Sequence, residues 1–276
     1  MSTEPSSTAA PRPPAPLAFG EQLRRRRQQR RLSQLALALE ADVSPRHLCF
    51  LETGRAAPSR EMVLRLGACL DAPLRERNGW LLAAGFAPMY SEHALDGDAL
   101  AEVRAVVQQL LDRQSPYPAI AMDRHWNLVA ANAATGVVLA GADPSLLQPP
   151  YNVLRLCHHP RGLRSRIANL AQVRENHAWR LRQQVRLNGD PELQRMLAAL
   201  EAEGATGAST PLAGVVVPFQ VHSPLGVLSF ITATTVFGPV ADITLSELAI
   251  ELFLPADATT AAAVPKLVAG AGSSGT

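Results

Sequence analysis

The sequence predicts a protein of two domains: an all-α domain of five helices, followed by an α+β domain with a five-stranded antiparallel sheet. Three observations lead to this prediction. Apolar residues recur at helical spacing from residue 18 to residue 88, with capping residues between the helical stretches. A short polar link at 89–97 follows. Runs rich in β-branched and aromatic residues, separated by turn residues, then occur at 119–131 and 215–254.

The composition is that of a globular protein that can bury two cores. The chain has 276 residues, of which 47% are hydrophobic and 18% are charged. No apolar run is as long as a membrane span, and no charged stretch precedes an apolar one at the start, so we expect neither a membrane partner nor a signal peptide. Cys49, Cys69 and Cys157 lack the spacing of a metal site. These features fit a reducing, cytoplasmic location.

Positive charge is concentrated near the N-terminus. Residues 18–88 carry 12 arginines against seven acidic residues, a net charge of +5. From residue 89 onward, 13 lysines and arginines stand against 16 acidic residues, a net charge of −3. This distribution is typical of a protein whose first domain contacts phosphates. The arginines at 24–26 are expected to be solvated or to face phosphate.

The stretch at 34–52 predicts two short helices joined by a tight turn. Ser33 and Ser44 are suitable N-caps, and Pro45 occupies the first helical position, where its missing N–H costs nothing. Gly54 follows the second helix as a left-handed stop. Two such helices make a helix-turn-helix, whose second helix fits the major groove of DNA.

Three further helices and a tail complete this part of the prediction. The helices are expected at 19–30, 60–70 and 74–84, which gives a domain at 18–88. Residues 1–17 contain five prolines and few apolar side chains, so we expect a disordered tail.

The first residues of the second helix are the candidates for reading DNA. They are Ser44, Arg46, His47 and Phe50, with Pro45 between them. Arg46 can donate two hydrogen bonds to a guanine edge, and Phe50 can pack on a thymine methyl. The alternative is a plain helical hairpin with a solvated basic face.

Several motifs in this region resemble the XRE, or phage-repressor-like, family of regulators. They are Leu32-Ser33-Gln34, Val43-Ser44, Leu51-Glu52-Thr53-Gly54 and Pro58-Ser59. The longer strings at 44–65, 74–78 and 83–88 resemble the MmyB-like branch. The resemblance implies a lambda-repressor-like fold and a transcription regulator that binds a double-stranded DNA operator, and we expect it to do so as a homodimer. Asp42 stands where many relatives have glycine, but aspartate tolerates the left-handed conformation.

The resemblance also implies roles for single residues. Gln34 matches a glutamine that contacts the DNA backbone or braces the recognition helix. Arg27 matches an arginine that pairs with the acid before Thr-Gly, here Glu52, so we expect a structural Arg27–Glu52 pair. Arg55 and Ser59 follow the recognition helix and are expected to contact the DNA backbone.

The second domain, expected at 98–258, mixes helices and strands. Helices are predicted at 98–114, 153–156, 163–187 and 192–203. Strands are predicted at 119–123, 126–131, 215–221, 227–237 and 243–254. The first of these helices could instead be a dimer contact. Flexible segments are expected at 204–211 and 259–276.

This second part resembles the MmyB-type ligand-binding domain, which is PAS-like. The motifs that carry the resemblance lie at 117–120, 123–127, 130–133, 159–163, 237–238 and 250–257. One member of the family accommodates a fatty acid. The resemblance therefore implies that this domain senses a small apolar ligand, with a fatty acid as the expected class.

A fatty-acid site needs an apolar tunnel and one cation or donor for the carboxylate. Candidate wall residues are Met122, Trp126, Leu156, Trp179, Phe219 and Phe230. Candidate carboxylate partners are His158, His159, Arg161 and Arg164. For each wall residue, filling the core is the more common role.

Two alternatives remain open from the sequence. The second domain could serve only for dimerisation or for docking a protein partner, without any ligand. The run Cys157-His158-His159 could hold a metal or haem in a redox sensor, although adjacent residues rarely point to one metal. An enzyme is not expected, because the sequence has no nucleophile elbow, no glycine-rich phosphate loop and no clearly paired carboxylates. We accordingly expect no metal and no cofactor.

Overall fold

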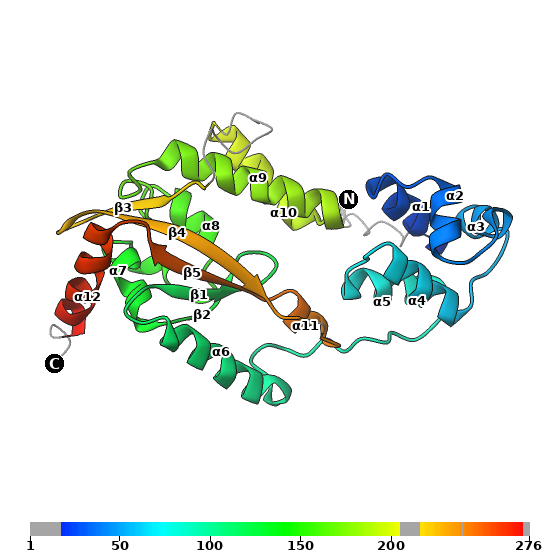
Figure 1. Ribbon diagram of the computed structural model, residues 1–276, viewed down its shortest axis with the longest axis horizontal. Helices are drawn as coiled ribbons and strands as arrows, with labels where there is room; N and C mark the ends of the chain where they lie inside the picture. The colour runs from blue at the N-terminus through cyan, green and yellow to red at the C-terminus, as the bar shows by residue number, and fades with distance from the viewer. Residues whose placement is uncertain (1–17, 205–215, 239, 273–276) are drawn as a thin grey trace, which may run out of the picture. The chain divides into compact units, whose positions relative to one another are not determined.

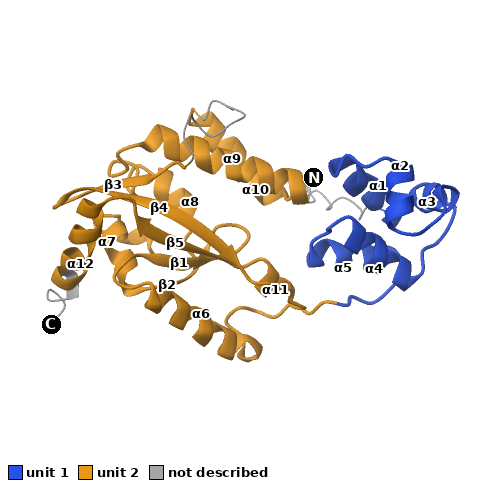
Figure 2. Ribbon diagram, viewed as in Figure 1, with its two compact units in different colours: residues 1–89 blue, residues 90–276 orange. Residues whose placement is uncertain are grey.

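The computed structural model describes residues 18–204, 216–238 and 240–272. The chain forms two compact units, Met1–Met89 and Tyr90–Thr276, which are coloured separately in Figure 2. The tail expected at 1–17 lies outside the described residues, as does the expected break at 204–211 apart from Gly204.

The described part of the N-terminal unit is all-α, as predicted (Figure 1). Its helices are α1 (Phe19–Gln29), α2 (Gln34–Glu40), α3 (Pro45–Glu52), α4 (Arg60–Cys69) and α5 (Leu74–Ala83). Ser33, Ser44 and Ser59 each accept a hydrogen bond from a backbone N–H three residues later, which satisfies a free donor at the start of a helix. Asp42 and Gly54 adopt the predicted left-handed conformation, with φ of 51° and 72°.

Apolar side chains from α1 to α5 meet in one core. Trp80 is fully buried and meets Phe19 edge to face, with 6.1 Å between the ring centroids. The contact between α1 and α3 is so close that a Cβ added to Gly20 would lie 2.4 Å from the backbone oxygen of Leu51. Only glycine fits at this point of the sequence.

Arg26 belongs to this core, so the prediction that it is solvated or faces phosphate is wrong. It is 2% exposed and donates to the backbone oxygens of Leu70, at 3.3 Å, and Asp71, at 2.5 Å. Burial lowers the pKa of Arg26, and the nearby charge of Glu76 acts in the opposite direction. The carbonyls that end α4 need donors, and this arginine supplies them.

The described strands of the C-terminal unit form the predicted five-stranded antiparallel sheet, in the order β2-β1-β5-β4-β3. The strands are β1 (Ala119–Met122), β2 (Leu128–Ala131), β3 (Phe219–Ser223), β4 (Gly226–Val236) and β5 (Ala249–Pro255). The helices are α6 (Ala101–Arg113), α7 (Gly136–Leu139), α8 (Val153–His158), α9 (Leu170–Asn188), α10 (Pro191–Ala202), α11 (Ile243–Ser246) and α12 (Ala258–Gly272). Short 3-10 turns occur at Asp98–Leu100, Ala133–Thr135 and Pro144–Leu146.

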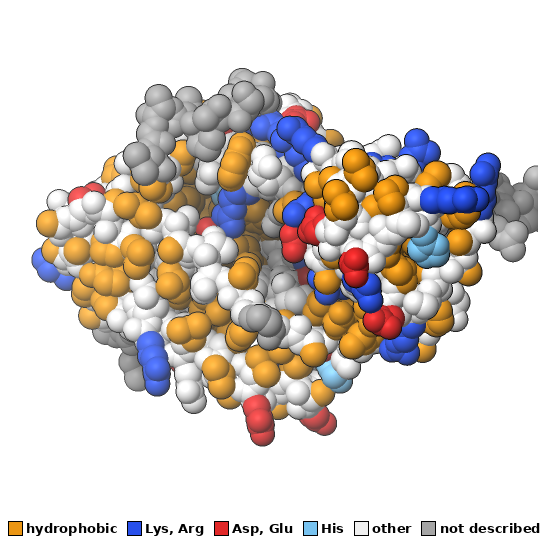
Figure 3. All heavy atoms as spheres, turned by 45° about the vertical axis from the view of Figure 1, so that its right-hand side comes forward, with side chains coloured by type: hydrophobic (Ala, Val, Ile, Leu, Met, Phe, Trp, Pro, Cys, Tyr) orange, Lys and Arg blue, Asp and Glu red, His pale blue; other side chains and the backbone are white. Residues whose placement is uncertain are grey.

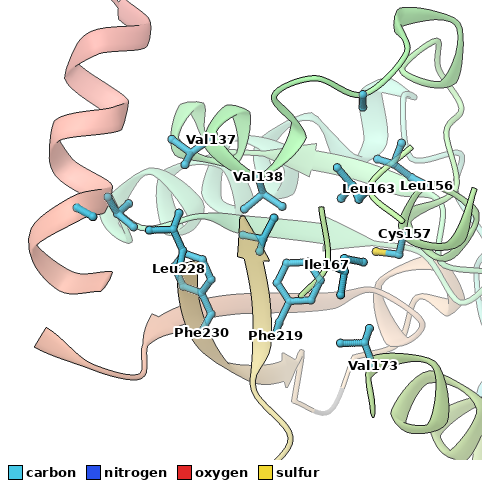
Figure 4. Close-up of a cluster of buried hydrophobic side chains, with 14 residues drawn as sticks. Val137, Val138, Leu156, Cys157, Leu163, Ile167, Val173, Phe219, Leu228 and Phe230 are labelled. Atoms are coloured by element: carbon cyan, nitrogen blue, oxygen red, sulfur yellow. The ribbon is translucent and has the colours of Figure 1, made fainter. Parts of the chain in front are cut away.

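Helices cover both faces of the sheet (Figure 1). On one face, α6 packs with Ala119, Ala121 and Ile250. On the other, α7, α8, α9 and α12 pack with residues of β3 and β4 in the cluster that Figure 4 shows, where Phe219 and Phe230 lie among the helix side chains. Because side chains alternate along a strand, each face of the sheet has its own core.

The predicted helix at 163–187 begins later than expected. Residues 163–169 form turns, apart from Ile167, which makes an antiparallel bridge to Val221, and α9 starts at Leu170. The turn segment uses its backbone at the sheet edge instead: Ala168 donates to the oxygen of Gln220, at 2.9 Å, and His222 donates to the oxygen of Arg166, at 2.8 Å. Pairing with distant β3 therefore overrides the local helical pattern.

The strands predicted at 215–221 and 243–254 are each partly wrong at their starts. Within the described residues, β3 begins at Phe219. Residues 243–246 are the short helix α11, because the side chain of Asp242 caps it by accepting from the N–H of Leu245 at 3.1 Å. β5 begins only at Ala249.

The flexible tail predicted at 259–276 is wrong over the residues described there, because these form α12. Alanine is the strongest helix former, so a run of small residues is compatible with a helix. Val264 and Ala263 are buried, and the hydroxyl of Thr260 accepts from the backbone N–H of Ser229 at 2.9 Å. Residues 273–276 lie outside the described residues.

Most of the predicted link at 89–97 is bound to the C-terminal unit. Ile243 donates to the oxygen of Ser91 at 2.8 Å, and the ring Nδ1 of His93 lies 2.8 Å from the carboxylate of Asp242. Arg104 of α6 donates to the backbone oxygens of residues 95 and 97. This segment is thus part of the C-terminal unit's structure.

We expect Gly20→Ala to lower the free energy of unfolding of the N-terminal unit by about 1–3 kcal/mol, because the backbones of α1 and α3 must separate. Urea unfolding followed by circular dichroism measures this change. Gly79→Ala is the matched control, since a Cβ there would meet only Gln22 Oε1 at 3.8 Å. Equal effects of the two substitutions would contradict the close contact.

Candidate functional site

The outward side of α3 presents the predicted DNA-reading residues. Ser44, Pro45 and Arg46 are exposed, and His47 and Phe50 are half-buried. The guanidinium carbon of Arg46 lies 5.4 Å from the centre of the Phe50 ring, a cation–π distance. The side chains are therefore open to solvent, and the phenyl ring restricts where the arginine head points.

The hydroxyl of Ser44 is already engaged in the structure. It accepts from the backbone N–H of His47 at 3.1 Å, as a helix cap. A phosphate contact by this residue would use the same end of α3, where free N–H groups and the helix dipole favour an anion.

Among its described residues, the N-terminal unit carries eight exposed arginines on several of its elements, and Figure 3 shows arginine side chains projecting from its surface. They are Arg24, Arg25, Arg30, Arg31, Arg46, Arg55, Arg60 and Arg65. Ser59 is exposed too, although its hydroxyl caps α4. Such a surface suits the phosphate backbone of a duplex.

A buried ion pair holds α3 in place. Arg27 donates to both carboxylate oxygens of Glu52, at 2.6 and 2.9 Å, as the resemblance implies. Gln34 donates to the same carboxylate at 2.8 Å, which is the bracing role. Burial raises the pKa of Glu52, but the hydrogen bonds from Arg27 and Gln34 outweigh it and leave the pKa below its ordinary value. One carboxylate thus joins α1, α2 and α3.

The C-terminal unit contains a largely apolar cavity between its sheet and the helices α7, α8 and α9. The space inside it that the centre of a water-sized molecule can occupy has a volume of about 70 Å³. Among the predicted wall residues, Trp126, Leu156 and Phe219 line it. Ile120, Leu128, Val138, Leu139, Tyr151, Val153, Leu163, Val173 and Phe253 complete most of the apolar lining.

The other predicted ligand residues do not line this cavity. Met122 and Phe230 are buried in core clusters, and Trp179 is half-buried elsewhere on α9. Arg164 is half-buried, with Nη1 3.4 Å from the carboxylate of Glu203. Nε2 of His158 lies 3.0 Å from Nδ1 of His177. Of these two histidines, only His177 lines the cavity.

The polar end of the cavity was missed by sequence reasoning. Arg180 of α9 donates to Glu251 of β5 at 2.9 Å, and both line the cavity together with Asn176. Glu251 is 6% exposed. A single acid within the apolar run 249–254 was the available signal, because a buried strand rarely carries an unpaired charge.

Trp126 enters the cavity from a strained turn. Its φ is +66°, which is rare for a bulky residue. The carboxylate of Asp123 holds the turn by accepting from the N–H groups of His125 and Asn127 at 2.8 and 2.9 Å. The indole ring lies 4.5 Å beneath the guanidinium of Arg180. The strain therefore places an aromatic ring against the cavity's cation.

The residues 157–159 have three different partners. Cys157 lies in the apolar cluster, His158 pairs with His177, and Nδ1 of His159 accepts from the backbone N–H of Arg161 at 3.1 Å. Burial raises the pKa of Cys157 to about 12, and the charge of Glu251 adds to the shift. The thiol is therefore protonated at neutral pH and is a poor nucleophile.

Two family models match the chain. One, a helix-turn-helix domain, matches residues 18–80, and the other, the MmyB-like transcription regulator ligand binding domain, matches residues 103–267. No individual curated protein matches significantly. Among the described residues, no helix is both long enough and apolar enough to cross a membrane.

The fold and the two matches define a DNA-binding transcription regulator with a ligand-binding domain. The chain belongs to the MmyB-like transcription regulators. The matched domains are regulatory and not enzymatic.

We expect the His158–His177 pair to make the C-terminal unit less stable in acid. Burial, with the charges of Arg174 and Arg164, lowers the pKa of His158 to about 4, and burial lowers the pKa of His177 well below its usual value. Both rings are neutral when folded, so the stability they contribute is complete above the unfolded pKa near 6.5 and is lost as pH falls towards 4.

Between pH 7 and pH 5, the shifted pKa of His158 alone should lower the free energy of unfolding by about 2 kcal/mol, which urea unfolding at the two pH values measures. The double substitution His158→Gln with His177→Gln should remove this part of the pH dependence of the free energy of unfolding. The part that is due to the carboxyl groups should remain. An unchanged slope in the double variant would show that the pair is not responsible.

Proposed function

We propose that this regulator binds a two-fold DNA operator as a homodimer through α3, and that a small apolar ligand in the cavity changes its DNA affinity. The observation that carries the proposal is an apolar cavity with one polar end, in a domain of the ligand-binding family, linked to a unit with an open recognition helix.

On the DNA side, Arg46 is the proposed base reader. Its contact with Phe50 limits the positions of the guanidinium, so less entropy is lost when it meets a guanine edge. Phe50 and His47 would contact neighbouring bases. Arg55 and Ser59 would contact phosphates, because they follow α3 and are exposed.

On the ligand side, the proposed occupant is a chain-like apolar molecule, with a fatty acid as the class that the family resemblance implies. Apolar side chains from three helices and the sheet form the walls, so an alkyl chain entering the cavity would lose contact with water.

A covalent route connects the two proposed activities. β5, which carries Glu251, follows directly after α11, and α11 binds residues 91 and 93. On the other side, the N–H of Met89 donates to Asn78 of the N-terminal unit at 2.9 Å. A ligand that shifts β5 would therefore act on a very short connection to the DNA-binding unit.

Dimerisation through α6 is a second role that one observation favours. Val106 and Leu110 project from α6 with exposures of 58% and 43%. A helix with apolar residues on its outer side is suited to pack against a second copy. Val106→Arg with Leu110→Arg should then yield monomers in light scattering, whereas an unchanged mass would exclude α6 as the contact.

Substitution of two arginines tests the DNA-binding proposal. Arg46→Ala should cost about 1–3 kcal/mol on the preferred operator and relax the choice of one base pair, while random DNA is affected less. Arg55→Ala should weaken binding to all sequences similarly and reduce the salt slope by about 1. Fluorescence anisotropy against salt concentration measures both. Equal losses on operator and random DNA for Arg46→Ala would refute its reading role.

Blocking the cavity tests the ligand proposal. At least one compound among decanoic acid and its uncharged derivatives should raise the unfolding temperature of the wild-type protein, because a ligand stabilises the state it binds. Leu139→Trp fills the cavity and should abolish this response. Leu187→Trp on the exposed part of α9 is the control and should retain it. A response that survives Leu139→Trp would place binding outside the cavity.

A further inference from the structure

We propose that the cavity selects a ligand whose head group is uncharged and both donates and accepts hydrogen bonds, with a primary carboxamide as the best-fitting class. This inference rests on the proposal that the cavity binds an apolar ligand. It concerns only the polar end, where Arg180 and Glu251 meet.

The cation at this end is already neutralised. Nη1 of Arg180 lies 2.9 Å from Oε1 of Glu251, and the two side chains are only 20% and 7% exposed. The indole ring of Trp126 holds the other side of the guanidinium, 4.5 Å from its carbon atom. Arg180 is therefore fixed by two protein groups before any ligand enters.

The remaining titratable groups that line the cavity add no charge. His177 is buried and its pKa lies well below neutral, so the ring is uncharged. Burial raises the pKa of both the Cys157 thiol and the Tyr151 phenol, so both keep their protons. Within the described lining, one positive and one negative charge thus cancel at this end.

A carboxylate head group would fit this end poorly. It would lie beside the carboxylate of Glu251, which is only 6% exposed, and like charges repel strongly in a buried site. To take Arg180 for itself, it would have to leave Glu251 buried without a partner, which is costly. An ammonium head group meets the same difficulty against Arg180. A head group with a charge of either sign would therefore leave the buried site with a net charge.

A carboxamide satisfies both members of the pair without breaking it. Its carbonyl oxygen can accept from the guanidinium nitrogens of Arg180 that do not face Glu251. Its NH₂ group can donate to Oε2 of Glu251, since the bond from Arg180 goes to Oε1. Asn176, one turn before Arg180 on α9, lines the same cavity and offers a further donor and acceptor.

The test compares head groups on one alkyl chain with the full-length protein. Decanamide, decanoate and decylamine are titrated at pH 8 by isothermal calorimetry, where the acid is ionised and the amine is protonated. The wild-type protein should bind decanamide at least tenfold more tightly than either charged compound. Binding of decanoate as tight as that of decanamide would overturn the inference while leaving the proposed cavity ligand in place.

The nearly isosteric variant Glu251→Gln tests the cause. Removing the negative charge frees Arg180 to bind a carboxylate. The affinity for decanoate should therefore rise at least tenfold, and decanoate should become the preferred ligand. Glu247→Gln, a carboxylate outside the cavity lining, is the matched control and should keep the wild-type order. An unchanged preference in folded Glu251→Gln would overturn the inference. If that variant does not fold, the wild-type order of the three compounds decides.

The following outcomes distinguish a failure of this inference from a failure of the proposed function. If none of the three compounds binds the wild-type protein, or if Leu139→Trp leaves their binding intact, the cavity is not the ligand site and both proposals fail. A preference for decanoate that Leu139→Trp abolishes would retain the ligand site and reject only the head-group selection.

Discussion

The Arg27–Glu52 ion pair is the interaction on which the DNA-binding unit depends. Glu52 ends α3, and its carboxylate receives hydrogen bonds from α1 and from the first residue of α2. If either charge were lost, the other would remain buried without compensation, which is far costlier than losing an exposed pair. The position of the recognition helix therefore rests on polar contacts at its end, and on the glycine contact between α1 and α3. On the outward side of α3, Ser44, Pro45 and Arg46 are exposed.

The C-terminal unit uses a similar pair differently. Arg180 and Glu251 also join a helix to a distant element, but they lie at a cavity, with Trp126 beneath the guanidinium. In the N-terminal unit the carboxylate stabilises a fixed helix arrangement. In the C-terminal unit the pair presents donors and acceptors to an open space. The same chemistry is structural in one place and available to a ligand in the other because the surrounding packing differs.

Local sequence patterns predicted most of the elements and part of the sites. Caps such as Ser33 and Ser44 depend only on neighbouring residues, and the left-handed turn at Asp42 does too, so these predictions were confirmed. The Arg27–Glu52 pair was accessible through family resemblance. Arg26 was misjudged because its partners, the carbonyls after α4, lie more than 40 residues away. The turns at 163–169 and the helix α12 were missed for the same reason, since contacts with β3 and β4 determine them.

The sequence by itself determined the two-domain division, the helix-turn-helix, the α+β class of the second domain and the surface residues of α3. Each follows from spacing, capping or charge along a short stretch of chain. Only the tertiary structure decided most of the cavity lining, since sequence reasoning named Trp126, Leu156 and Phe219 but neither Arg180 nor Glu251. Trp126, Arg180 and Glu251 come from a turn, a helix and a strand that are far apart in sequence, and their meeting depends on how the sheet and helices pack. A cavity is a property of that packing, and no local pattern encodes it.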